Sequence, residues 1–226
     1  MDALNDFLSA VDGYVWGIPL IVLIMAVGII LTVRTGLVQV FHLPRALKYM
    51  FKNEEDGKGD VSSFGALCTA LSATIGTGNI VGVATAIAGG GPGALFWMEF
   101  MALLGMATKY AEGLLAVKYR EIDSDGKVLG GPFYYIEKGM GENWKWLAKI
   151  FAVFGVMVGL LGIGTFSQIN GITSAVNNFF DANNAWTVQL FGRDYSWTVV
   201  IAGIILTIFV AFVIIGGLRR ISAVAQ

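Results

Sequence analysis

Charged residues are scarce in this sequence. They make up 14% of its 226 residues, whereas a soluble domain carries about 25%. Hydrophobic residues account for 56%, and the mean hydropathy is +0.70. This composition predicts an integral membrane protein, with the lipid bilayer as its first partner. The net charge of −1 gives no basis for a nucleic-acid partner.

Cysteine and histidine are scarcer still. With Cys68 alone, no internal disulfide can form. With His42 alone, neither a histidine-based metal cluster nor a Ser–His pair can be assembled. Residues 76–82 are rich in glycine, but they lack the preceding strand and the Lys-Ser/Thr pair of a phosphate-binding loop. We therefore predict that the protein is not an enzyme and needs no organic cofactor.

Five apolar runs are each close to the roughly 20 residues that a helix needs to cross a bilayer. They cover residues 16–33, 63–88, 94–117, 147–173 and 197–217. These runs predict an all-α, polytopic transmembrane protein with about five spans. The acidic segment 1–12 has no basic n-region and no small-residue cleavage site, so we predict no removable signal peptide.

The basic residues fix the predicted orientation of these spans. The connection after the first span holds five, the connection after the third holds six, and two follow the fifth. On the opposite side there is only Arg193, and Lys109 lies inside a span. Basic residues collect on the cytoplasmic side of a membrane. The N-terminus is therefore predicted to lie outside the cell and the chain to be a multi-pass protein of the cytoplasmic membrane.

Several connections have a recognisable character. Residues 41–51 alternate apolar and basic side chains at helical spacing, which predicts an amphipathic helix on the cytoplasmic face. Residues 53–60 form a polar linker, and the glycine-rich turn 89–93 makes the second and third spans antiparallel neighbours. After the polar loop 121–131, residues 132–140 are predicted to start a short surface helix with proline in its first turn.

The centre of the second span is a poor helix. Residues 73–79 read Ala-Thr-Ile-Gly-Thr-Gly-Asn, so glycines and β-branched threonines interrupt a stretch long enough to cross the membrane. One interpretation is a discontinuous helix, whose freed N–H and C=O groups hold an ionic substrate and a cation. The other is close packing, because Gly78 and Gly82 have the spacing that lets two helices approach.

Charged residues inside the third span are costly and therefore informative. Lys109 and Glu112 are three residues apart on one helix face, so a structural or gating ion pair is predicted. Glu99 lies near the external turn and receives no role.

Neutral polar residues gather late in the fourth span. They are Thr165, Ser167, Gln168 and Asn170, preceded by Gly159, Gly162 and Gly164. A glutamine in a span usually bonds to a neighbouring helix, but beside a broken second span Gln168 could also bind the substrate. Asn79 is similar, since its amide offers both an acceptor and donors.

Several runs together form a specific motif set. They are Gly59-Asp60-Val61-Ser62-Ser63-Phe64, Ala66-Leu67-Cys68-Thr69-Ala70-Leu71, Thr74-Ile75-Gly76-Thr77-Gly78-Asn79-Ile80, Gly90-Gly91-Pro92-Gly93-Ala94 and Gly105-Met106-Ala107-Thr108-Lys109-Tyr110-Ala111-Glu112. Lys118-Tyr119-Arg120 and Gly130-Gly131-Pro132 extend this set. The combination resembles the alanine or glycine:cation symporter family, the sodium:alanine symporters, over nearly the whole chain.

The resemblance implies a LeuT-type fold of two inverted five-helix repeats, with one extra helix ahead of them. Residues 1–60 would then hold the extracellular N-terminus, the extra helix and the cytoplasmic amphipathic connection. Residues 61–226 would hold four helices of the first repeat and stop before its fifth. This N-terminal half would need the C-terminal half of the same protein as a partner.

The resemblance also implies roles for single residues. The N–H groups of Gly76, Thr77 and Gly78 would bind a substrate carboxylate at the positive end of a half-helix. Asn79 would contact the substrate or lie beside it, and Gln168 would contact the bound amino acid.

A sodium site is implied next to the substrate. The carbonyls of Ser72 and Ile75 would supply the first-repeat ligands, with the Thr74 hydroxyl as a further oxygen, and the second repeat would supply the rest. Residues 61–90 contain no Asp, Glu or His, and proton carriers usually rely on such a group inside the membrane. Sodium is therefore the expected coupling ion.

The expected function is the sodium-coupled import of small neutral amino acids, alanine or glycine, by alternating access. A carrier of glutamine or of another neutral amino acid is an alternative within the same class. A membrane-embedded sensor that binds an amino acid without moving it is an alternative from another class.

Overall fold

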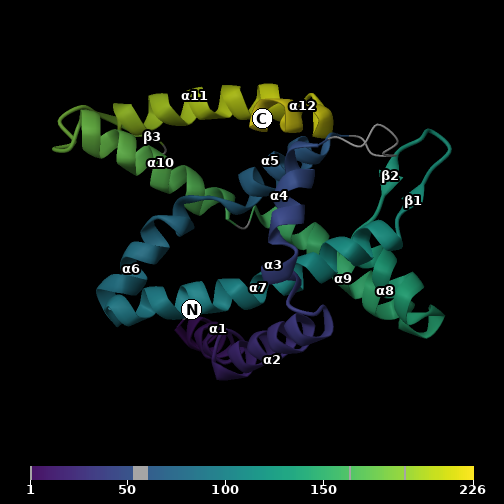
Figure 1. The fold of residues 1–226 in the computed structure, drawn as a ribbon. Helices are drawn as coiled ribbons and strands as arrows, with labels where there is room; N and C mark the ends of the chain where they lie inside the picture. Colours follow the sequence, from purple (N-terminus) through teal and green to yellow (C-terminus); the bar gives the residue numbers. More distant parts are fainter. Residues whose placement is uncertain (1, 53–60, 163, 191) are drawn as a thin grey trace.

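The computed structural model describes residues 2–52, 61–162, 164–190 and 192–226. It is mostly helical and follows an open path, with α11 along one edge and α2 and α7 along the opposite one (Figure 1). The polar linker predicted at residues 53–60 lies outside the described residues.

The α-helices are α1 (Asp2–Val15), α2 (Ile18–Arg34), α3 (Val38–Phe41), α4 (Leu43–Phe51), α5 (Ser63–Thr74), α6 (Val81–Gly90), α7 (Pro92–Lys118), α8 (Pro132–Met140), α9 (Lys145–Leu161), α10 (Thr165–Phe180), α11 (Trp197–Ile214) and α12 (Gly217–Ala225). The 3₁₀ turns are η1 (Thr77–Asn79) and η2 (Glu142–Trp144). Two hairpins pair β1 (Glu121–Ile122) with β2 (Val128–Leu129), and β3 (Thr187–Leu190) with β4 (Arg193–Ser196), both antiparallel.

Four helical stretches are long and apolar enough to cross a membrane. They are Leu4–Arg34, Pro92–Lys118, Glu142–Phe180 and Trp197–Ile214. The pair Ser63–Thr74 and Thr77–Gly90 meets the same test when it is counted as one span, although its two parts are bent by 75°. With the bent pair counted as one span, these stretches correspond to the five predicted runs, except that the last ends at Ile214 and not at residue 217. The composition and helix lengths of a polytopic helical membrane protein are confirmed.

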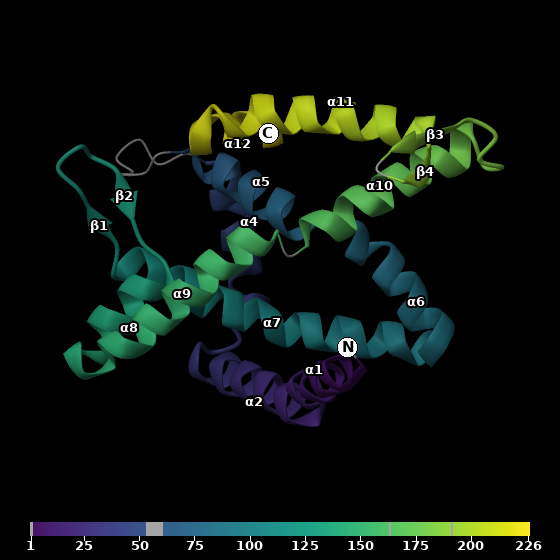
Figure 2. The same ribbon diagram turned by 180° about the vertical axis from the view of Figure 1, so that it is seen from behind.

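The second and third spans, which were predicted to be antiparallel neighbours, make contact at the turn that joins them but diverge away from it (Figures 1 and 2). Gly91 joins α6 to α7 at a φ of +67°, where glycine is favoured, and Pro92 opens α7 in the first turn. The two helices pack on each other near this turn. They meet at a corner in both views, so they do not run side by side along their whole length (Figures 1 and 2).

The chain differs from expectation at three places. Residues 2–15 form α1, a helix that the sequence analysis did not predict. The expected loop 121–131 contains the short β1–β2 hairpin, with Gly126 at a φ of +77° in its turn. The fourth span is interrupted, because α9 ends at Leu161 and α10 starts at Thr165.

The surface helices follow the predicted pattern. The amphipathic segment forms α4, with Pro44 in its first turn, and Pro132 opens α8. Lys138 on α8 binds Glu121 on β1 at 2.5 Å, which ties the hairpin to the helix.

The packed centre lies where α2 crosses α7. The buried hydrophobic residues among those described are Leu104, Ala107 and Ala148. A Cβ placed on Gly28 would lie 2.9 Å from the Leu104 Cβ, so glycine permits this close crossing. Most other apolar side chains are exposed, as is expected of helices that face lipid or further protein.

Candidate substrate and ion site

The site begins where α5 ends. The Ser62 hydroxyl caps the start of α5 by accepting a hydrogen bond from the Gly65 N–H at 3.0 Å. At the other end, Ile75 and Gly76 are extended, and the helix stops in mid-span. Of the two interpretations that the sequence left open here, the 75° bend between α5 and the η1–α6 segment supports the discontinuous helix.

The break is a short, hydrogen-bonded turn. The Gly76 N–H donates to the Asn79 Oδ1 at 2.9 Å, and the Asn79 N–H donates back to the Gly76 carbonyl at 3.0 Å. Asn79 therefore organises the break with its side chain. The amide hydrogens of its side chain make no hydrogen bond with any described residue, so they remain available to a ligand.

Gln168 closes the break from α10. Its Oε1 accepts a hydrogen bond from the Thr77 N–H at 3.1 Å, across 91 residues of sequence. A Cβ on Gly76 would lie 2.1 Å from the Gln168 Nε2, so a larger residue here would displace this amide. The structure thus brings Gly76, Thr77, Asn79 and Gln168 together.

The packing interpretation of Gly78 and Gly82 finds no support in the described part of the chain. A Cβ on either residue would meet no atom within 4 Å. The close approach is made instead by Gly171 on α10, where a Cβ would lie 2.8 Å from the Thr77 Cγ2. Sequence analysis had not assigned Gly171.

The helix ends at the break carry opposite partial charges. No described group donates a hydrogen bond to the carbonyl oxygens of Ser72, Thr74 or Ile75. These carbonyls lie at the negative end of α5, and the N–H groups of η1 lie at the positive end of the second half-helix. A cation is favoured at the first end and a carboxylate at the second.

The hydroxyl groups of α5 turn back onto the helix. Ser72 Oγ donates to the Thr69 carbonyl at 2.8 Å, and Thr74 Oγ1 donates to the Ala70 carbonyl at 2.6 Å. Each hydroxyl oxygen keeps lone pairs for a cation. The described residues contain no cluster of three or more His, Cys, Asp or Glu that could hold a metal, so any cation here would depend on neutral oxygens.

A cavity of about 640 Å³ adjoins the break. It lies between the end of α5, the start of α10 and α11, and its lining includes Ala73, Gln168 and Thr207. Its volume is in the range of small-molecule sites. Thr207 was missed by the sequence analysis; its signal was a hydroxyl within the strongly apolar run of α11. The neighbouring Thr165, also on the lining, belongs to the polar cluster that the sequence indicated.

Glycines shape the start of α10. Gly162 and Gly164 have φ values of +61° and +89°, which favour glycine. The N–H of Gln168 donates to the Gly164 carbonyl at 3.1 Å. The new helix start therefore aims Gln168 at the η1 turn.

A hydrogen-bonded cap joins α10 to α11 at their outer ends (Figure 2). Asp181 accepts from the N–H groups of Ala185 at 2.8 Å and Trp186 at 3.2 Å, and from the Ser196 hydroxyl at 3.1 Å. The Ala185 hydrogen bond has the largest effect on the pKa of Asp181 and lowers it from its ordinary value of 3.8. Burial opposes this, and the weaker hydrogen bonds from Trp186 and Ser196 lower the pKa further. The cap holds α10, and hence Gln168, against α11.

The charged residues of α7 form a separate feature. Lys109 Nζ binds the Glu112 Oε2 at 2.7 Å, which confirms the predicted pair. Neither residue lines the cavity beside the break, so the pair lies outside this site.

Comparisons with known proteins identify a family of membrane transporters. The sequence model of the sodium:alanine symporter family matches residues 1–226. An uncharacterized transporter of Haemophilus influenzae is 54% identical over 99% of this chain and 45% of its own length. The sodium/alanine symporter AgcS of Methanococcus maripaludis is 47% identical over 96% of the chain and 46% of its own length.

A third relative, named as a probable sodium/glutamine symporter, is GlnT of Bacillus subtilis. It is 34% identical over 99% of this chain and 43% of its own length. The chain thus spans a little under half the length of these curated relatives.

Proposed function

Because this chain belongs to the sodium:alanine symporter family, we propose that the protein containing it imports alanine or glycine together with sodium. The family consists of transporters and not of enzymes, and the apolar helices make this an integral membrane protein. The chain covers under half the length of its relatives, so transport is proposed for the complete protein.

The hydrogen bond between Thr77 and Gln168 is the observation that carries this proposal. In this hydrogen bond, a backbone N–H at the break of the candidate span donates to a side-chain oxygen from another helix. A substrate carboxylate presents the same kind of acceptor with a full negative charge, and the positive end of the half-helix favours it. In our proposal the carboxylate takes this N–H and those of Gly76 and Gly78, while Gln168 and Asn79 turn to the rest of the amino acid.

The cation is proposed to bind at the opposite end of the break. The carbonyls of Ser72 and Ile75 and the hydroxyl of Thr74 supply neutral oxygen ligands. No described group donates a hydrogen bond to these two carbonyls. Oxygen dipoles of this kind replace the water shell of sodium with no change of protonation. Facing helices of a second repeat would complete the shell, as in a LeuT-type arrangement with binding at the repeat interface.

The proposed cycle is alternating access in the cytoplasmic membrane, with the N-terminus outside. Sodium entering down its gradient favours the loaded outward state, and the broken helix lets the halves of α5–α6 move relative to α10. The cavity beside Gln168 gives the substrate side chain a place of limited size.

Glutamine is the second candidate substrate, favoured by the relative named as a glutamine symporter. Counterflow in proteoliposomes compares the candidates: preloaded liposomes should take up labelled alanine faster than labelled glutamine. A non-transporting sensor would bind alanine and show no counterflow, which would contradict the proposal.

The residue-level test uses Gln168→Ala in the complete protein. Thr77 and Gln168 are half-buried in this chain, and we propose that the complete, loaded protein covers them; a polar group left unpaired there costs about 1–3 kcal/mol, so alanine affinity should fall roughly five- to hundred-fold. Asn170→Ala is the matched control, because Asn170 lies two residues further along α10, is exposed and does not line the cavity. Equal affinity for the two variants would remove Gln168 from the proposed site.

A further inference from the structure

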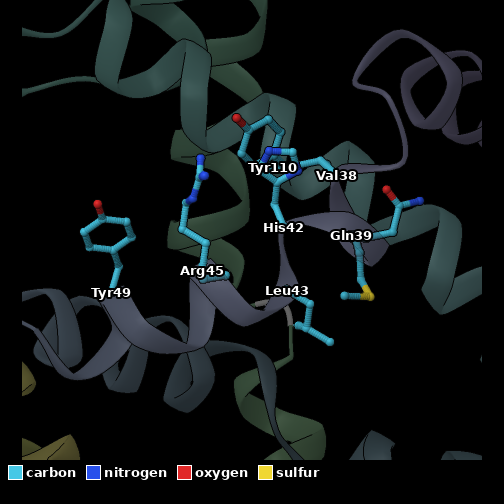
Figure 3. A pocket seen from close by; sticks show the side chains of 9 residues that line it. Val38, Gln39, His42, Leu43, Arg45, Tyr49 and Tyr110 are labelled. Atoms are coloured by element: carbon cyan, nitrogen blue, oxygen red, sulfur yellow. The ribbon is translucent and has the colours of Figure 1, made fainter.

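A second pocket lies away from the broken helix, between the α3–α4 segment and α7 (Figure 3). Its volume is about 380 Å³, within the range of small-molecule sites. It lies on the side of the protein that holds the basic connections, just after α2 ends at Arg34. In the orientation predicted from the basic residues, this is the level at which a helix that lies along a membrane surface meets phospholipid headgroups.

One wall of the pocket is cationic and rich in donors. His42 and Arg45 are three residues apart, and Figure 3 shows their side chains rising from the same side of the α4 segment. The Tyr110 hydroxyl on α7 lies across from this segment. No acidic side chain is among the described residues that line the pocket. An anion is therefore the ligand that this wall would attract.

Gln39 adds a requirement of a different kind. The residue is only 7% exposed, and its Nε2 donates to the Thr32 Oγ1 at 3.0 Å. Its Oε1 is buried and has no hydrogen-bond donor within the described part of the chain. In Figure 3 this oxygen lies on the side of the amide nearer to His42. Buried acceptors are usually satisfied, so the oxygen points to a ligand that donates a hydrogen bond.

Part of the lining is apolar, and we call it the apolar wall. It consists of Leu43 on α4 and Met106 on α7, both exposed. A ligand of this pocket therefore combines an anionic group, a hydrogen-bond donor and hydrocarbon. A free inorganic anion would leave the apolar wall uncovered.

We propose that this pocket binds one anionic phospholipid whose headgroup carries hydroxyl donors, as phosphatidylglycerol does. Its phosphate lies between Arg45, His42 and the Tyr110 hydroxyl. A headgroup hydroxyl donates to the Gln39 Oε1, and the acyl chains run beside Leu43 and Met106. Phosphatidylcholine fits poorly, because its headgroup has no hydrogen-bond donor and its ammonium would approach Arg45.

The test measures lipid retention by the complete protein in detergent with native mass spectrometry. The protein is titrated with phosphatidylglycerol, phosphatidylcholine and, in a separate arm, inorganic phosphate. We expect one phosphatidylglycerol to be retained at concentrations at which phosphatidylcholine is lost. Arg45→Gln should weaken that retention about fivefold, the usual effect of one basic residue at an anionic lipid surface.

Two variants separate this site from general charge. Lys48→Gln removes one positive charge from the same helix outside the pocket lining, so retention should stay within twofold. Gln39→Leu keeps the side-chain volume and removes the acceptor, so the preference for phosphatidylglycerol should fall while the protein stays folded by circular dichroism. If Gln39→Leu unfolds, Arg45→Gln still tests the retention of phosphatidylglycerol, because Arg45 is exposed and its substitution should not disturb the fold.

Other outcomes would overturn the proposal. If Arg45→Gln and Lys48→Gln lost phosphatidylglycerol equally, its retention would depend on the overall charge of the helix and not on this pocket. Displacement of phosphatidylglycerol by inorganic phosphate at equal concentration would make the pocket a free-anion site. Equal retention of phosphatidylcholine would remove the anionic headgroup from the argument.

Discussion

At the scale of single residues, the contact between η1 and α10 depends on small side chains as much as on polar ones. Thr77 offers its N–H to Gln168 at 3.1 Å, and it sits close above Gly171. A Cβ on Gly171 would lie 2.8 Å from the Thr77 Cγ2, closer than carbon atoms pack. The position of the N–H is therefore linked to the size of residue 171.

This linkage predicts a rescue. Gly171→Ala should push Thr77 away from Gln168 at an overpacking cost of about 1–3 kcal/mol, and alanine affinity in the complete protein should fall five-fold or more. Thr77→Ser removes the Cγ2 methyl and keeps the backbone N–H and the hydroxyl. The double variant Gly171→Ala with Thr77→Ser should recover most of the affinity, measured by binding of labelled alanine.

Gly82→Ala is the control for this pair, because its Cβ would meet no atom within 4 Å in the described part of the chain and the residue is not part of the proposed site. It should reduce affinity less than Gly171→Ala does. If Thr77→Ser failed to restore binding to the Gly171→Ala variant, the contact between these two residues would not set the position of the N–H.

Sequence reasoning reached some of these residues and not others. Asn79 and Gln168 were predicted to matter because a polar side chain is conspicuous in an apolar span. Gly171 and Thr207 were not, because their importance depends on which helix faces them. A glycine in mid-helix has no local signature that distinguishes a contact with Thr77 from an open position such as Gly78.

At the scale of elements, two interrupted spans face each other. The α5–α6 span breaks at Ile75 and Gly76, and the α9–α10 span breaks at glycines with positive φ. Each break frees backbone groups, which membrane proteins tolerate where the backbone lines a cavity or contacts protein. The two breaks and α11 enclose the cavity beside Gln168, so the site is built from helix ends.

The cap between α10 and α11 leads to a prediction about pH. Hydrogen bonds lower the pKa of Asp181, Ala185 contributing most, so the folded cap binds its proton less readily than the unfolded segment does. Its stabilising effect is then present above the ordinary value of 3.8 and is lost as the pH falls through the lower folded pKa. Amide hydrogen exchange in residues 182–198, corrected for its intrinsic pH dependence, should accelerate only in that acidic range.

Asp181→Asn provides the comparison for this prediction. It removes the titrating carboxylate, so exchange in the same segment should already be faster at neutral pH and should show no added acid-dependent step. An unchanged acid-dependent step in Asp181→Asn would assign the effect to another group.

Helices with a clear local sequence signal were predicted well, whereas the interruption between α9 and α10 was not predicted. The amphipathic pattern placed α4, because alternating faces are a local property of the sequence, and the proline after the polar loop placed α8. The α9–α10 break was averaged away inside one long hydrophobic run, although its glycines had been noticed. Helix α1 was missed because Asp6 and Asp12 lower the hydrophobicity of its segment, while Phe7 and Leu8 still form an apolar face.

At the scale of the whole molecule, burial is slight. The share of each candidate span that is buried runs from 0% in α11 to 11% in α7, so lipid or further protein must cover most of their surface. The helical membrane class followed from composition, but the pairing of helices did not, because apolar exteriors match many neighbours equally well.

The orientation of the spans is predicted from the basic residues. In a Cys68→Ser background, Ser124→Cys in the turn between β1 and β2 should react with a membrane-impermeant maleimide only in inside-out vesicles. Asn183→Cys, between α10 and β3, should react only in intact cells. Labelling of both from the same side would contradict the proposed number of crossings, and the reverse pattern would place the N-terminus inside.

The choice of coupling ion is the last prediction, and it depends on what lies around the break. Helices α5, α6 and α10 contain no Asp, Glu or His, so the break has no side chain suited to carry a proton at working pH. It has the carbonyls of Ser72 and Ile75 and the amide of Gln168, which are neutral oxygens. Glu112, a carboxylate in the second half of α7, is already paired with Lys109 at 2.7 Å.

We therefore expect alanine uptake by the complete protein in liposomes to follow an imposed sodium gradient and to continue at constant pH. A proton gradient in sodium-free buffer should drive no uptake. Lys109→Met with Glu112→Gln removes the ion pair as a unit, and this variant should keep its sodium dependence because the pair does not line the cavity. Uptake that follows the pH gradient and ignores sodium, and that disappears in this double variant, would make Glu112 the proton carrier in place of the carbonyl site.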